Sequence, residues 1–203
     1  NCQLSDDGQR LIVERFDIDD GTQLGFEDLC TLQGIPSEGK YSGDYLSGFK
    51  TLIRQVSPIE APQVRADLFK FAVLMTVIRS SDHHLKKFGV IYDKERRHIR
   101  LAPFYNLVTT SVYIPQNAPA LRFSREKVWP DRKILTQLGL SLGLRPKSID
   151  VLYSDVRAGI VQAIDEAVGY ADRHNDSLEI ISGLITEWSK STLIDLPKDN
   201  GLV

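Results

Sequence analysis

Cysteine is scarce in this sequence, and so is any excess of charge of one sign. The two cysteines among 203 residues, Cys2 and Cys30, are too few for a disulfide framework, and no Cys/His cluster has the spacing of a zinc site. Lys and Arg number 25 against 27 Asp and Glu, and the resulting net charge of -2 gives no general attraction to nucleic acid or to an anionic membrane. Such low cysteine use favours a reduced, cytoplasmic protein.

Long apolar runs are also missing. The longest, LFKFAVLMTVI at 68–78, falls short of the roughly 18 residues that a membrane-spanning helix needs, and it contains Lys70. No signal peptide is visible, so we expect a protein without a membrane association. The chain begins at Asn1 without a Met, and we therefore expect it to be cut from a longer protein.

The spacing of apolar residues predicts a mainly α-helical fold. They recur every three or four positions from 43 to 58, and Pro58 ends that helix. The segment 60–81 has Pro62 in its first turn and is apolar on nearly every side from Leu68 onward, as expected of a helix at the centre of the core. Further helices are expected at 25–33, 131–144, 146–171 and 177–194.

Strand signals are fewer and lie in the first half of the chain. Branched apolar residues predict a strand within 9–17. FGVIYD at 88–93 and HIRLA at 98–102 flank a charged turn and predict a β-hairpin. Region 109–130 holds three prolines and few periodic signals, so we expect an irregular excursion there. The small β element should hold the polar loop at 81–87.

That polar loop, SDHHLKK at 81–87, contains the residues best suited to catalysis. Asp82 follows the buried helix, and its carboxylate can accept a proton from a hydroxyl nucleophile. His84 and Lys86 alternate, so in an extended loop they would share one side and could orient the acid or meet a phosphate. Asn106 should lie near the loop if the hairpin strands pair. From spacing alone, however, the cluster is more typical of a solvated polar corner with a capping role.

Four segments, in matching order, resemble one known family. DHHLKK at 82–87, the hairpin after it and LAPFYN at 101–106 resemble the catalytic loop and metal-binding motif of the HipA-like serine/threonine kinases, the bacterial persistence toxins. LIVERFD at 11–17 resembles the segment that joins their two lobes and contacts adenine, and EDLCTLQGIPSEGKY at 27–41 resembles the stretch after it. The resemblance covers about 1–110, and the remainder agrees only in being helical.

The family resemblance implies a protein-kinase-like fold, in which residues 1–203 form the helical C-terminal lobe of a HipA-type kinase. It implies a hinge strand at 1–17, a half carrying the catalytic loop at 18–110 and a helical remainder at 111–203. The family's N-terminal lobe, with its phosphate-contacting lysine, is absent from this chain. We therefore expect that phosphate transfer requires that missing lobe.

The resemblance also implies roles for individual residues, with ATP as phosphate donor, magnesium as cofactor and a protein serine or threonine as acceptor. Asp82 falls on the catalytic base. The other members of the catalytic-loop motif are His84 and Lys86. The residues assigned to nucleotide binding are Glu14, Arg15, Phe16 and Tyr105. The positions assigned to the metal are Asn106 and Lys87.

Both metal positions depart from the family pattern. Lys87 stands where the family has Asn, and Asn106 stands where it has the magnesium-binding Asp. Magnesium prefers hard and usually anionic oxygen ligands, so a cation and a neutral amide should hold it poorly. We expect loss of normal activity, and the alternative is that Lys87 neutralises phosphate directly as a point charge.

Three functions remain open at this stage. The first is an active toxin kinase lobe, and the second is a pseudokinase that binds a nucleotide or a protein partner such as an antitoxin or a true kinase. The third is a helical interaction domain unrelated to kinases. For the first two, the expected partners are a protein substrate or an antitoxin, without direct contact to nucleic acid or membrane.

Overall fold

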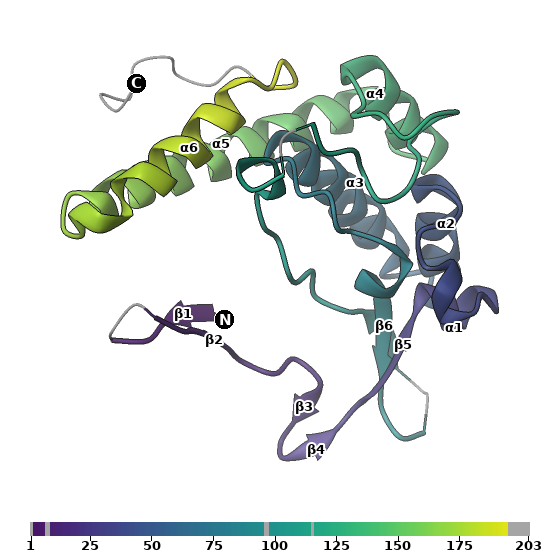
Figure 1. Ribbon diagram of the computed structural model, residues 1–203. Coiled ribbons are helices and arrows are strands. Elements are labelled where there is room, and N and C mark those ends of the chain that lie inside the picture. The colour runs from purple at the N-terminus through teal and green to yellow at the C-terminus, as the bar shows by residue number, and fades with distance from the viewer. Residues whose placement is uncertain (1, 7–8, 96–97, 115, 195–203) are drawn as a thin grey trace.

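The computed structural model describes residues 2–6, 9–95, 98–114 and 116–194, and it confirms the mainly α-helical expectation (Figure 1). The helices are α1 (Leu29–Gln33), α2 (Tyr45–Gln55), α3 (Ala61–Val77), α4 (Arg132–Ser141), α5 (Pro146–Ala171) and α6 (Leu178–Ser189). The strands are β1 (Cys2–Leu4), β2 (Leu11–Val13), β3 (Ile18–Asp19), β4 (Thr22–Gln23), β5 (Gly25–Asp28), β6 (Gly89–Tyr92) and β7 (Ile99–Leu101). The part of the chain that the structure describes contains no helix long and apolar enough to cross a membrane.

Helix α3 lies at the centre of the core, as its apolar sequence predicted. Leu68, Phe69 and Met75 are fully buried within it, and α2, α4 and α5 all pack against it (Figure 1). Pro62 occupies its first turn, where the missing proline N–H would have had no helical partner. The last three residues of α3, Met75–Val77, are all buried, and this fixes the direction in which the chain leaves the helix and enters the polar loop.

The predicted hairpin is present as β6 and β7, and β5 pairs with β6 to make a three-stranded antiparallel sheet. The expectation of a helix over 25–33 is therefore wrong for its first four residues, which form β5. The physical reason lies far along the chain, in the pairing of Asp28 with Gly89. A Cβ at Gly89 would come within 2.5 Å of the Glu27 carbonyl oxygen, so only glycine permits this close approach.

Two small hairpins precede this sheet. The strand expected within 9–17 is confirmed as β2, which pairs with β1. Strands β3 and β4 are joined by Asp20 and Gly21, both with positive φ, as a tight hairpin turn of this type requires. In Figure 1 these hairpins lie apart from the packed helices, and β5 connects them to the sheet.

The C-terminal half follows the sequence prediction closely. Helices α4, α5 and α6 lie within the three predicted ranges, and residues 195–203 are outside the described part. The excursion at 109–130 contains a single 3-10 turn, Thr110–Val112, among its described residues. It is anchored by two indoles, because Trp188 donates to Thr109 Oγ1 at 2.8 Å and Trp129 donates to the Asn117 carbonyl at 2.9 Å.

The central position of α3 gives a stability prediction. Phe69 is fully buried and meets the Tyr153 ring edge-on at 5.4 Å, so Phe69→Ala should lower the free energy of unfolding by about 3–5 kcal/mol. The matched control is Ile59→Ala at a side chain that is 91% exposed, which should change it by less than about 0.5 kcal/mol. Urea denaturation followed by circular dichroism measures both. Equal losses for the two variants would contradict the central role of α3.

Candidate active site

The polar loop is held rigidly between the core and the sheet. After α3 the chain passes through Arg79 in the left-handed region, with φ of 54°, and residues 85–87 then form a 3-10 turn called η2. Leu85 is buried, and its N–H donates to the Lys40 carbonyl at 3.0 Å. The Tyr45 hydroxyl donates to the His83 carbonyl at 3.1 Å. On the other side of Asp82, the Ser81 N–H donates to Thr110 Oγ1 at 2.9 Å, so the loop backbone is anchored on both sides of Asp82.

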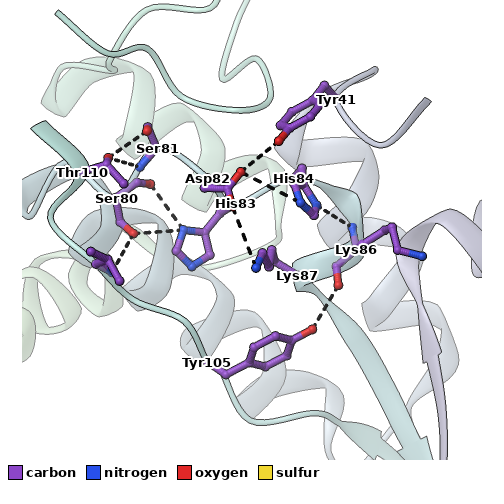
Figure 2. A network of polar contacts seen from close by, with 11 residues as sticks. Tyr41, Ser80, Ser81, Asp82, His83, His84, Lys86, Lys87, Tyr105 and Thr110 are labelled. Atoms are coloured by element: carbon purple, nitrogen blue, oxygen red, sulfur yellow. Dashed lines mark hydrogen bonds and ion pairs between the residues drawn. The ribbon is translucent and has the colours of Figure 1, made fainter. Parts of the chain in front are cut away.

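The Asp82 carboxylate stands at the surface with three polar neighbours (Figure 2). The Tyr41 hydroxyl donates to Oδ1 at 3.0 Å, and His84 Nε2 lies 4.0 Å from the same oxygen. Lys87 Nζ lies 3.9 Å from Oδ2. The Asp82 side chain is still 48% exposed, so a group from solution can reach this anchored carboxylate.

His84 is set in one orientation by its own backbone neighbours. Its Nδ1 accepts a hydrogen bond from the Lys86 N–H at 3.2 Å, and a backbone amide can only donate. Burial lowers the pKa of His84, and this outweighs the opposite effect of the Asp82 charge. The lowered pKa favours the neutral ring, and because Nδ1 accepts, the hydrogen of that neutral ring is on Nε2, the nitrogen that faces Asp82.

Lys86 lies on the other side of the loop. The structure differs here from the extended backbone expected at the loop, because η2 turns consecutive side chains in different directions. Lys86 Nζ lies 3.1 Å from Asp28 Oδ2, whereas the ammonium of Lys87 approaches Asp82. His84 and Lys86 thus do not share one side of the loop.

Asp28 is a site residue that the sequence interpretation missed. It caps α1 by accepting from the Thr31 N–H at 2.9 Å, and it pairs with Lys86. Burial by itself raises the pKa of Asp28, but the Thr31 N–H and the Lys86 ammonium together hold it below its ordinary value. An aspartate immediately before a helical pattern is a capping signal that could have identified it.

The segment after the hairpin runs alongside the loop, as expected. The Tyr105 hydroxyl donates to the Lys86 carbonyl at 3.0 Å, and the Val108 N–H donates to Ser80 Oγ at 3.2 Å. Asn106 lies between these two anchors, exposed and with a φ of 60°, a region that asparagine tolerates better than most residues. The structure therefore brings the segment that carries Asn106 to the catalytic-loop candidate.

The residues assigned to nucleotide binding are only partly brought together. Phe16 stacks on Tyr105 with ring centroids 5.6 Å apart, which joins the hinge segment to the loop through the Tyr105 hydroxyl. Arg15 is exposed and donates twice to Asp17, at 2.9 and 2.5 Å. The Glu14 side chain is exposed as well. If Glu14 and Arg15 bind adenine, we therefore expect their backbone groups to do so.

The donor set at the two metal positions does not fit a pair of magnesium ions. Lys87 brings a cation to within 3.9 Å of Asp82, and Asn106 offers a neutral amide. The buried carboxylate of Asp28 is already paired with Lys86. Within the described ranges, no three His, Cys, Asp or Glu side chains gather as they would around a metal ion.

Similar proteins place these features in a family context. The model of the HipA-like C-terminal domain matches residues 1–164. A Sinorhizobium fredii protein named "Putative kinase Y4dM" is 34% identical over 123 residues, which are 59% of this chain and 29% of that protein. A chain in the Shewanella oneidensis MR-1 toxin–antitoxin complex of HipA, HipB and operator DNA shares the fold, with a TM-score of 0.72 at 19% identity. That match covers 94% of this chain and 51% of the other, so this chain spans about half or less of these relatives.

The pairing of Asp28 with Lys86 gives a pH prediction. Because the pKa of Asp28 is lowered on folding, its contribution to stability is present above the unfolded value of about 3.9 and is lost as the pH falls toward the folded value. Asp28→Ala should lower the free energy of unfolding at pH 7 by about 0.5–2 kcal/mol, the usual cost of losing a helix cap. Asp28→Asn keeps a capping oxygen and should cost less.

Urea denaturation between pH 7 and pH 3 measures these differences. The gap between the wild type and Asp28→Asn should narrow below about pH 4, where Asp28 of the unfolded chain takes up a proton while its folded counterpart, with a lowered pKa, is still ionised. A gap that stays constant over this range would show that the ionised form of Asp28 has no special partner.

Proposed function

The chain belongs to the family of HipA-like C-terminal domains, and from this premise we propose that it is the catalytic half of a kinase that phosphorylates a protein serine or threonine with ATP. The observation that carries the proposal is the hydrogen bond from the Tyr41 hydroxyl to Asp82 Oδ1 at 3.0 Å. A general base must accept a hydroxyl hydrogen in this way, at this distance, from its substrate. Asp82 is anchored and half-exposed, and both properties suit that role.

The neighbours of Asp82 would act by holding it in place. In the proposed site, His84 Nε2 lies 4.0 Å from Oδ1, beyond hydrogen-bond distance, and would act on the carboxylate as a nearby polar group. Lys86 positions the turn η2 through its ion pair with Asp28. Phe16 and Tyr105 provide an aromatic surface near the hinge for the nucleotide base, together with the backbone of residues 14–16.

We also propose a partner of the antitoxin kind. The Shewanella complex with the same fold contains HipB and operator DNA. With a net charge of -2, this chain has no general attraction of its own to DNA, so contact with nucleic acid would pass through the antitoxin. This chain spans about half of that relative, so the proposed activity would also need what the other half of the relative provides.

A second candidate function is a pseudokinase. It is favoured by one observation, the poor fit of Lys87 and Asn106 to magnesium. Such a protein would keep the fold and the anchored loop but would bind a nucleotide, an antitoxin or a true kinase without transferring phosphate.

Phosphate transfer by the full-length protein tests the proposal. The assay measures transfer of radiolabelled phosphate from ATP to a mixture of candidate substrate proteins. Asp82→Asn should reduce the rate of transfer by about 100-fold or more, since a general base typically accelerates a reaction 10²–10⁴-fold. Asp165→Asn, at an exposed position of α5, is the matched control and should keep wild-type activity. Transfer that survives Asp82→Asn would remove Asp82 from the role of base. Nucleotide binding by the wild type without any transfer would favour the pseudokinase.

A further inference from the structure

We infer that Lys87 binds the phosphates of the nucleotide directly, in the place where a kinase of this family would use a divalent cation. The inference rests on the proposed function, because it describes how the same site would hold its nucleotide. It starts from the poor fit between the donor set at this site and magnesium.

The ammonium of Lys87 is close to Asp82 but forms no hydrogen bond with it. The 3.9 Å between Lys87 Nζ and Asp82 Oδ2 is an ion-pair distance that exceeds the length of a hydrogen bond. No hydrogen bond from Lys87 Nζ is formed to any residue that the structure describes, so its three N–H donors remain available to a ligand. The side chain is 21% exposed, so solvent reaches part of it.

The neighbouring lysine shows that this availability is particular to position 87. Lys86 is bound at 3.1 Å to Asp28, at the start of α1, and its charge is matched there. The 3-10 turn has about three residues per turn, so the two lysines point in different directions. The same turn that directs Lys86 to a structural partner directs Lys87 to the candidate base.

Two other segments bring more positive charge to the Tyr41 ring, which lies beside Asp82. Lys40 Nζ lies 5.2 Å and Lys127 Nζ lies 6.0 Å from the centre of the Tyr41 ring, whose hydroxyl is bonded to Asp82. Two further ammonium groups therefore lie beside the Tyr41 ring, next to the pair of Lys87 and Asp82, although the one from Lys127 also donates to the Tyr41 carbonyl at 2.9 Å. Such a site repels a divalent cation and attracts a polyanion, and lysine binds phosphate as a point charge.

Titration calorimetry of the full-length protein with ATP, in EDTA and in magnesium, tests this inference. The wild type should bind ATP in EDTA with an affinity similar to that in magnesium. Lys87→Met should weaken ATP binding in EDTA by roughly ten- to hundredfold, the loss expected for one charge-assisted contact. Its affinity for adenosine, which has no phosphate, should stay at the wild-type value and shows that the variant is folded. Lys133→Met, an exposed lysine of α4, is the charge-matched control.

A gain-of-function variant gives the converse measurement. Lys87→Asn combined with Asn106→Asp restores the oxygen donors of the family pattern, and ATP binding by this variant should require magnesium. Wild-type binding that disappears in EDTA, or Lys87→Met with undiminished ATP affinity, would overturn the inference and leave the proposed kinase intact. Absence of ATP binding in both conditions would overturn the proposed function and this inference together.

Discussion

The burial of the C-terminal half of α3 is the constraint on which the polar loop depends. A helix end as closely packed as Met75–Val77 cannot shift to accommodate the segment that follows it, so the left-handed turn at Arg79 delivers the loop to one position. Leu85 then enters the core three residues after Asp82 and fixes the other end. A half-exposed carboxylate is usually mobile, but this one is held by the apolar anchors on both sides of it. Packing thus provides the rigidity that a base requires.

The direction that the 3-10 turn gives to Lys86 and Lys87 determines where their positive charges lie, and the sequence of two adjacent lysines alone does not. A run of two lysines would form one undivided patch of positive charge on a flexible loop. Here the turn separates them, so that Lys86 stabilises the junction of β5 and α1 through Asp28 while Lys87 faces Asp82. The charge available to a ligand therefore comes from one lysine of the pair, and the other lysine is part of the scaffold.

The helices could be predicted because their apolar spacing is local information, and Pro62 and the buried run around Leu68 located α3 correctly. The strand β5 could not be found this way, because it exists through pairing with Gly89, some sixty residues later, and its apolar Phe26 fits a helical pattern as well. The site shows the same division. The family motif predicted which segments meet, but the contact of Tyr41 with Asp82 depends on tertiary folding that no local pattern encodes.

Whether the proposed kinase is active therefore depends on how the site holds the phosphates of the nucleotide, more than on the presence of a base. Asp82 has the hydrogen-bonding geometry of a base, with a hydroxyl already on its Oδ1. A base accelerates transfer only if the phosphoryl group is held and its charge is balanced, because positioning and electrostatics supply most of the catalysis in this chemistry. With Asn106 neutral, that balance must come from cations of the protein itself, and Lys87 is the one that lies beside the base. In the proposed site, poor magnesium binding would therefore not by itself mean loss of activity, since a lysine can supply positive charge to the phosphates without supplying oxygen ligands for a metal.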